Sequence, residues 1–291
     1  MAFWGILSAL LSAGSWALGT IIFERIGKSV PFAGITFLKG IFSILLMILL
    51  LLCTGGLQPI GGQEFIYLSL SGIIGIAIGD TLFFKSLQDL GAKTQVIFFL
   101  LGQILTMILS VLFLNERLTI TQYTGATILL TGIITVTWGT HENHPDKWRG
   151  ILCGTLSIIC FSTSIIMVKT AIAHVEIITA TFYRMIFGTI FTLGYGIAAR
   201  NIKSWIHPLS DKKLLSLFIL NVTIITYGGF LLATAAVKYI SVTLASVLST
   251  TEPVFVIILA YLITKEKITK REIIGTTLTL AGLLLIVLSK N

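Results

Sequence analysis

The sequence predicts an all-α integral membrane protein in which ten transmembrane helices form two inverted five-helix repeats. Hydrophobic residues make up 55% of the 291 residues and charged residues only 11%, whereas charged residues account for about 25% of a soluble domain. The apolar residues gather into ten runs, and a bilayer core needs roughly 20 such residues per helix. Two constant sequence offsets relate the first five runs to the last five.

Turn and charge signals separate the expected helices. Pro31 precedes the second run, and a glycine-rich stretch at 54–64 follows it. The expected spans are residues 3–23, 32–52, 65–87, 94–114, 120–140, 150–170, 177–199, 214–237, 242–264 and 272–289. The first run has neither a basic segment before it nor a clear cleavage site, so we interpret it as a membrane span and not as a removable signal.

The duplication is centred on the segment 115–119 (Asn-Glu-Arg-Leu-Thr), which returns 150 positions later at 265–269 as Lys-Glu-Lys-Ile-Thr. The same offset joins Gly79 to Gly229. An offset of 145 holds earlier in each half and joins the pairs Gly5 and Gly150, Ser12 and Ser157, and Lys39 and Arg184. The change of offset places five extra residues in the loop between the second and third helices of the second half.

The odd number of spans in each half determines their relative orientation. Because five spans end on the side opposite to their start, the second half must cross the membrane in the inverted sense. Many secondary transporters have inverted repeats and bind substrate near the midplane, where the halves meet. We expect a first repeat at 1–140, a linker loop at 141–149 and a second repeat at 150–291. A duplicated membrane scaffold that transports nothing is an alternative.

Several features of the chain resemble the EamA family of the drug/metabolite transporter superfamily. These are Trp16 in the first helix, a basic residue early in the second helix of each half (Lys39, Arg184), and the Glu-Arg/Lys-Leu/Ile-Thr segment followed by glycines. The resemblance covers nearly the whole chain and implies a transporter of amino acids, nucleotide-like metabolites, sugar phosphates or drugs. The family commonly has a proline in the fourth helix of each half, but here Pro253 has Gln103 as its counterpart.

Glu252 is the first candidate for a functional residue, because a charged group inside a span is costly when it faces lipid. Pro253 cannot donate a hydrogen bond to the carbonyl of Ser249, which favours a kink. Ser249 and Glu252 lie three residues apart, on one helix face. We expect both to bind substrate, Pro253 to act as a hinge, and Glu252 to couple transport to protons, since burial disfavours a charged carboxylate. Alternatively, Glu252 is a structural residue, protonated or paired with a Lys or Arg.

Lys39, Asp80 and Arg184 are further candidates for substrate binding. Asp80 could instead form a structural ion pair with either basic residue, and both basic residues could extend toward the membrane interface. Arg184 suits a carboxylate or phosphate, because a guanidinium can donate two parallel hydrogen bonds. Trp16 and Tyr227 are the aromatic residues expected to line the substrate site. The alternatives are Phe98, Phe99 and Phe161.

No motif in the sequence indicates catalysis, a metal site or a cofactor. There is no G-x-S-x-G segment and no P-loop, and the three cysteines form no C-x-x-C pair. The formal net charge is +8, but the basic residues stand at the ends of apolar runs and form no stripe, so nucleic acid is not an expected partner. The expected partners are a small-molecule substrate, the lipid bilayer and protons, and we expect a monomer.

We therefore expect a multi-pass protein of the cell inner (plasma) membrane that exports or exchanges a small polar metabolite, an amino acid or related zwitterion, by alternating access through a central cavity. A nucleotide-like metabolite importer or exchanger and a drug efflux transporter are alternatives. The family resemblance implies cytoplasmic termini, whereas the positive-inside rule predicts the opposite orientation. The basic residues on the side of the termini are few: Arg117, Lys169, Lys238 and Lys290.

Overall fold

The computed structural model describes residues 1–117, 119–137, 147–264 and 270–288. The segment 265–269 and most of the expected linker lie outside these residues. Lys147–Arg149, also placed in that linker, form the first turn of a helix. The described residues are helical or lie in turns and short connections, with no strand among them.

The first half contains five elements. They are α1 (Ala2–Ile26), α2 (Phe32–Thr54), α3 (Gly62–Ser71) with its π-helical continuation η1 (Gly72–Gly79), α4 (Asp80–Leu114) and α5 (Ile120–Thr137). At Gly91 in α4, φ is 75° and ψ is 166°, a conformation that glycine adopts readily. This residue ends the third span and begins the fourth.

The second half repeats this order. Its elements are α6 (Lys147–Ala171), α7 (Ile177–Ala198), α8 (Ile202–Ile206), η2 (His207–Ser210), α9 (Lys212–Thr223), the π-helical η3 (Ile224–Leu231), α10 (Leu232–Tyr239), α11 (Val242–Ser249), α12 (Glu252–Thr264) and α13 (Lys270–Leu288). Helices α8 and η2 lie in the loop that contains the five extra residues of this half. Six helical stretches of the described residues are long and apolar enough to cross a membrane, and shorter apolar helices accompany them at 101–114, 242–256 and 273–285. Each of the ten expected spans thus corresponds to a helical segment within the described residues.

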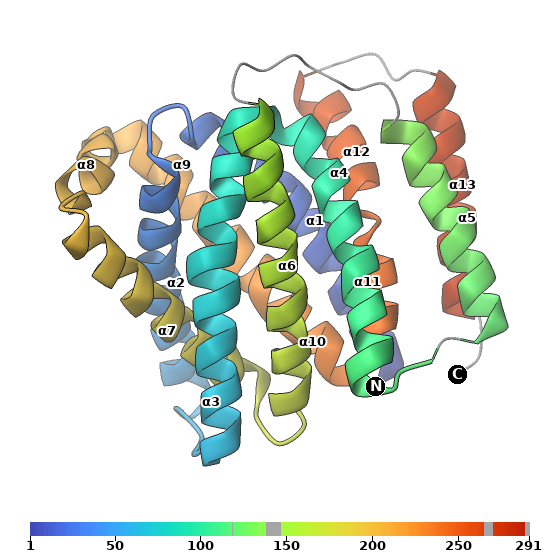
Figure 1. Cartoon of the computed structure of the whole chain (residues 1–291), viewed down its shortest axis with the longest axis horizontal. Helices are drawn as coiled ribbons and strands as arrows, with labels where there is room; N and C mark the ends of the chain where they lie inside the picture. Colours follow the sequence, from blue (N-terminus) through green and yellow to red (C-terminus); the bar gives the residue numbers. More distant parts are fainter. Residues whose placement is uncertain (118, 138–146, 265–269, 289–291) are drawn as a thin grey trace.

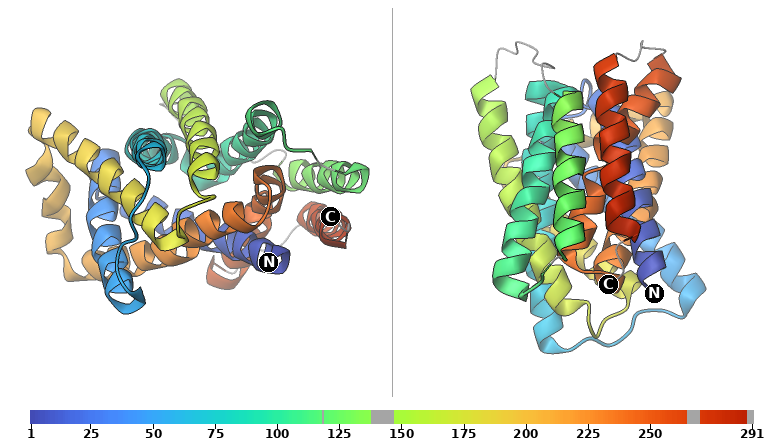
Figure 2. Two further views of the ribbon diagram at one scale, coloured as in Figure 1. Left: turned by 90° about the horizontal axis from the view of Figure 1, so that it is seen from below. Right: turned by 90° about the vertical axis from the view of Figure 1, so that its right-hand side faces the viewer.

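The contacts between the halves are reciprocal, and Figure 1 shows elements of both halves side by side across the bundle. Helix α1 contacts η3, α10, α11 and α12 of the second half, and α6 correspondingly contacts α3, η1 and α4 of the first. Helices α2 and α7 pack together, as do α5 and α13. Figure 2 shows α5 and α13 side by side at one edge of the bundle, with both chain ends at the same end of the molecule.

Glycines allow the closest approaches between the halves. A Cβ atom on Gly79 would lie 2.9 Å from the ring of Phe161, and the equivalent Cβ on Gly229 would lie 3.3 Å from the ring of Trp16. Phe161 is the equivalent of Trp16 at the offset of 145, and Gly229 is the equivalent of Gly79 at the offset of 150. The same contact therefore occurs once in each direction between the halves. The central aromatic residue of each half therefore packs on the third span of the other half.

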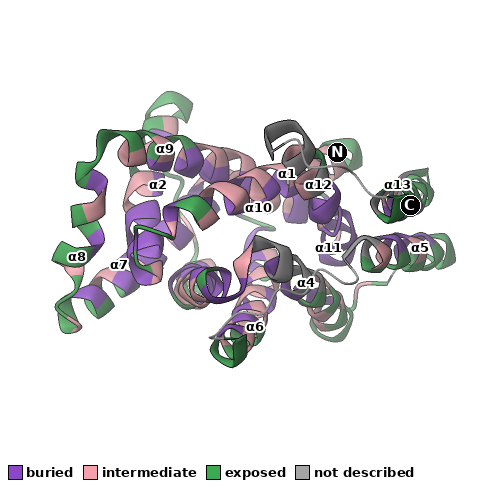
Figure 3. Ribbon diagram, turned by 90° about the horizontal axis from the view of Figure 1, so that it is seen from above, coloured by how far each residue is buried: buried purple, intermediate pink, exposed green. Residues whose placement is uncertain are grey.

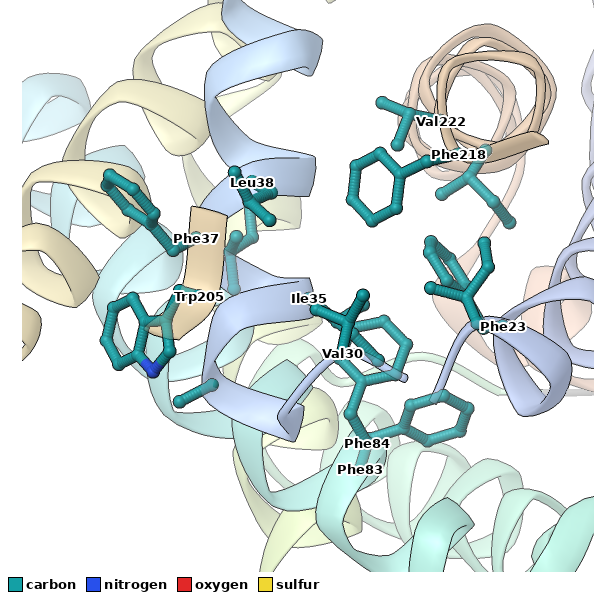
Figure 4. Packing of buried hydrophobic residues seen from close by; sticks show 14 of the residues in the cluster. Phe23, Val30, Ile35, Phe37, Leu38, Phe83, Phe84, Trp205, Phe218 and Val222 are labelled. Carbon is teal, nitrogen blue, oxygen red and sulfur yellow. The ribbon is translucent and has the colours of Figure 1, made fainter. Parts of the chain in front are cut away.

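Buried apolar residues form a core between the helices, while the outer faces are exposed (Figure 3). In the largest cluster, Phe84 and Phe218 come from two other helices and both pack against Phe23 of α1 (Figure 4). The ring centroids of Phe23 and Phe84 are 4.8 Å apart. Large apolar side chains such as Leu52 and Ile120 are exposed, as expected for helices whose outer faces contact lipid.

Candidate functional site

A cavity of about 170 Å³ lies between the two halves. Residues of α1, η1 and α4 line it from the first half, and residues of α6, α7, η3, α10, α11 and α12 line it from the second. A cavity of about 150 Å³ accommodates benzene, so this one has room for a small molecule. Aromatic side chains form part of its wall: Trp16, Phe83, Phe161 and Phe230. The ring centroids of Trp16 and Phe230 are 5.0 Å apart, edge to face.

Arg184 lies on α7 and lines the cavity. Its side chain is buried, with 7% of its surface exposed. One terminal nitrogen, Nη2, donates a hydrogen bond to Ser164 Oγ at 3.3 Å, whereas Nε is buried without a hydrogen-bond partner among the described residues. No carboxylate of those residues forms an ion pair with it. The guanidinium therefore retains donors for a ligand.

Close packing between α7 and η1 places this guanidinium. A Cβ on Gly72 would lie 2.3 Å from the backbone oxygen of Arg184, and a Cβ on Gly75 would lie 2.3 Å from Ser164 Oγ. Gly72 therefore lets η1 and α7 touch along their backbones, and Gly75 leaves room for Ser164 of α6, which accepts the hydrogen bond from Arg184. The small-residue spacing before Asp80 thus brings α7, and with it Arg184, against the third span.

Lys39 and Asp80, both of the first half, form a buried ion pair. Lys39 Nζ donates to Asp80 Oδ2, and the exposed fractions of the two side chains are 0% and 1%. The ammonium also lies 4.6 Å from the ring centroid of Phe230. Asp80 lines the cavity and Lys39 does not. The other oxygen of Asp80, Oδ1, is buried and accepts no hydrogen bond from the described residues.

The fourth span of the second half is broken in front of Pro253. Helix α11 ends at Ser249 and α12 begins at Glu252. The amides of Thr250 and Thr251 donate backward to residues 246–248, and those of Val254 and Phe255 donate to the Thr251 oxygen. Among the described residues, no backbone amide donates to the carbonyl oxygens of Ser249 and Thr250.

Glu252 lies at this break and faces the cavity together with Ser249. Its side chain is 4% exposed, and Oε2 accepts no hydrogen bond from the described residues. No Lys or Arg within that part of the chain forms an ion pair with it. The basic partner considered from the sequence is therefore absent from the described contacts in this conformation.

Glu116 holds the start of α11 in place. Its carboxylate accepts hydrogen bonds from the backbone amides of Val242 and Thr243, each at 2.8 Å, and from Thr243 Oγ1 at 2.9 Å. A carboxylate at a helix N-terminus satisfies free amides and stabilises the helix dipole. The repeated segment 115–119 thus joins the first half to the helix that carries Ser249.

Five of the seven candidate substrate-binding residues line the cavity: Trp16, Asp80, Arg184, Ser249 and Glu252. Tyr227 does not, because its hydroxyl donates to the Leu46 carbonyl at 2.7 Å, away from the lining. The sequence interpretation missed several polar lining residues, namely Ser12, Gln95, Gln103, Thr106, Ser157, Ser162 and Ser164. Ser12 and Ser157 could have been found, since they are equivalent at the offset of 145.

Comparison with known proteins agrees with this architecture. The profile of the EamA-like transporter family matches residues 3–138 and again residues 148–288. The inner membrane transporter YhbE of Escherichia coli (strain K12) is 30% identical over 138 residues, which are 47% of this chain and 42% of that protein. YhbE of Shigella flexneri matches equally well. The matched region spans less than half the length of these relatives.

A solved crystal structure of a protein superimposes on nearly the whole chain, with a TM-score of 0.73. The superposition covers 99% of this chain and 98% of the other, at 18% sequence identity. At this identity the likeness extends to the fold and not to the ligand.

Proposed function

The chain belongs to the EamA-like transporter family, and from this premise we propose that it exports a small zwitterionic metabolite, with amino acids as the favoured class, by alternating access. The observation that carries the proposal is the charge distribution of the cavity. Arg184 and Glu252 both line it, and neither is ion-paired among the described residues. Asp80 is neutralised by Lys39. A ligand with one negative and one positive group complements this arrangement.

Each lining residue has a role in the proposal. Arg184 binds the substrate carboxylate through its free donors, since guanidinium and carboxylate geometries match. Glu252, with Ser249, attracts the positive group. Trp16 forms an apolar wall beside them. Asp80 and its partner Lys39 set the local charge around Arg184 and do not bind the substrate themselves.

The location and assembly are part of the same proposal. The YhbE relatives are named inner membrane transporters, which supports placing this chain in the inner (plasma) membrane. Since the cavity is formed within one chain, the monomer is the proposed functional unit, with the bilayer and the substrate as its partners. Residues 1–140 and 150–291 act as the two rocking repeats, and Pro253 is the hinge of the ninth span.

Glu252 is also the proposed site of proton coupling. A carboxyl group removed from water favours its neutral form unless a partner stabilises the charge, so a conformational change that wets the cavity would exchange a proton. In liposomes, substrate flux should respond to an imposed proton gradient. The Glu252→Gln variant keeps a hydrogen-bond acceptor but loses the charge, so it should exchange substrate only at higher substrate concentration, and this exchange should ignore the gradient. If the parent is also insensitive, the protein is a facilitator or exchanger.

A ligand screen tests the substrate class. Purified protein would be heated in detergent with amino acids, with nucleotides and with cationic drugs, because a ligand that binds only the native state raises the unfolding temperature. We expect stabilisation by zwitterionic amino acids. Stabilisation by nucleotides or drugs alone would contradict this substrate class. A folded protein that binds and moves none of these metabolites would support a scaffold instead.

A further inference from the structure

We propose that the break between α11 and α12 is a binding site for a single positive charge, built from the Glu252 carboxylate, the Ser249 hydroxyl and the carbonyl oxygens of residues 249 and 250. The ligand chemistry is a monovalent cation. It is either the ammonium group of the substrate or an inorganic ion such as Na⁺. The ammonium alternative rests on the proposed function, whereas the inorganic one does not.

The atoms at the break are oxygens without their usual donors. Pro253 has no amide hydrogen, so it cannot bond to the Ser249 carbonyl, and Val254 donates to Thr251 instead of Thr250. Ser249 is half-buried on the cavity wall, and its hydroxyl makes no hydrogen bond within the described part of the chain. Buried carbonyl groups are costly to leave without a partner. A cation would satisfy several of them at once.

The helix ends favour a positive ligand held by a charged carboxylate. The C-terminal end of α11 is the negative pole of its dipole and points its last carbonyl groups toward the break. Glu252 is in the first turn of α12, where the positive pole of that helix stabilises a carboxylate. Broken helices in other transporters use the same free carbonyl groups to bind Na⁺, and oxygen ligands suit such a hard cation.

The first half lacks this site. The residues equivalent to Glu252 and Pro253 are Gly102 and Gln103, and α4 continues through both of them. No carboxylate and no proline-induced break are present at that position. The proposed site is therefore specific to the second half and does not follow from the duplication.

The test is a thermal-shift titration of the full-length protein in detergent. The probes are NaCl and methylammonium chloride, each compared with N-methyl-D-glucamine chloride at the same ionic strength, since that cation is too bulky for the break. At least one of the small cations should raise the unfolding temperature of the parent. Glu252→Gln should lose the shift, and Ser249→Ala should weaken the cation affinity by about tenfold, as expected for one hydrogen bond to a charged group.

Matched control variants separate this effect from general instability. Glu64→Gln makes the same change in a partly exposed residue outside the cavity, and Pro208→Ala replaces a proline that also lies outside it. Both controls should keep the parental shift, whereas Pro253→Ala should reduce it by restoring a donor for Ser249. If Glu252→Gln fails to fold, the Ser249→Ala and Pro253→Ala variants still test whether the break binds a cation.

The outcomes distinguish the two sources of the cation. A shift with Na⁺ alone identifies an inorganic ion site, and a shift with methylammonium alone identifies the place of the substrate ammonium. A shift with both identifies a site of low selectivity. No shift with either cation, or a full shift in both the Glu252→Gln and Ser249→Ala variants, would overturn the proposal. A failed amino-acid screen together with a Na⁺ shift would reject only the proposed substrate.

Discussion

Lys39 and Arg184 occupy equivalent positions in the two halves, yet their bonding partners differ. Lys39 is buried and forms an ion pair with Asp80. Arg184 lines the cavity, and its Nε has no hydrogen-bond partner among the described residues. The difference comes from one position. At the offset of 150, the equivalent of Asp80 is Phe230, so the second half has no carboxylate at the position that would pair with its basic residue.

The comparison separates structural charges from charges available to a ligand. A buried ion pair compensates its own desolvation only while both partners are present. The first half retains such a pair, and its fourth span continues past Gly102. The second half lacks the pair, and its fourth span breaks beside Glu252. The first half thus provides a wall whose buried charges neutralise each other, while the second provides both charges that we assign to the substrate.

Removing one member of the buried ion pair should have the largest effect on stability. Lys39→Met leaves Asp80 buried without a partner, and such a loss costs about 3–5 kcal/mol. The double variant Lys39→Met/Asp80→Asn should recover most of that loss. Arg184→Met should destabilise less, because it leaves no carboxylate unpaired. Thermal unfolding in detergent measures all three, and equal losses for Lys39→Met and Arg184→Met would break the comparison.

Arg184→Lys should weaken substrate binding by about 1–3 kcal/mol, because the charge remains but the planar pair of donors is lost. The measurement is the Kd of the amino acid found in the screen and the Kd of its carboxamide derivative. The carboxamide should bind the variant and the parent alike, since it carries no carboxylate. If Arg184→Lys binds the amino acid like the parent, Arg184 is not the anion site.

The broken helix should affect turnover. Pro253→Ala allows residue 253 to donate to the Ser249 carbonyl and should stiffen the span, so flux at saturating substrate should fall several-fold in liposomes. The reciprocal variant, Gln103→Pro, would introduce a break into the first half and tests whether the asymmetry matters. Unchanged flux of Pro253→Ala at saturating substrate would show that Pro253 does not act as a hinge.

The smallest expected effect concerns a contact that both halves share. Gln88 Nε2 donates to the Val30 carbonyl at 2.9 Å, and at the equivalent place Lys238 Nζ donates to the Val175 carbonyl at 2.7 Å. The first half shows that a glutamine amide can perform this role. Lys238→Gln should therefore change the free energy of unfolding by no more than about 0.5 kcal/mol. A large loss would mean that the ammonium charge itself is needed there.

Much of the fold could be predicted from the sequence, because apolar runs and constant offsets depend on composition and spacing alone. The break at residues 250 and 251 was also accessible, since Pro253 removes a specific donor. No sequence pattern predicted the π-helical segments, because their formation depends on how neighbouring helices pack. They lie at overlapping equivalent positions and directly precede Asp80 in the first half.

Only part of the candidate site could be predicted from the sequence. The cost of burying charge identified Asp80, Arg184 and Glu252, all of which line the cavity. The same cost could not show whether Lys39 pairs with Asp80 or contacts a ligand. The answer depends on which helix packs against Lys39 in the folded protein. Tyr227 was misplaced for a similar reason, because its helix face points toward Leu46 and not toward the cavity.

Counterflow in liposomes tests the central claim most directly, namely that the free charges of the second half carry a zwitterion across the membrane. Liposomes loaded with an unlabelled amino acid from the screen would be diluted into buffer containing the labelled compound. The account predicts transient accumulation of label with the parent and with Glu64→Gln, and a strong reduction with Arg184→Lys at low substrate concentration. Parental accumulation with Arg184→Lys, or none with folded parent for any zwitterionic amino acid, would contradict it.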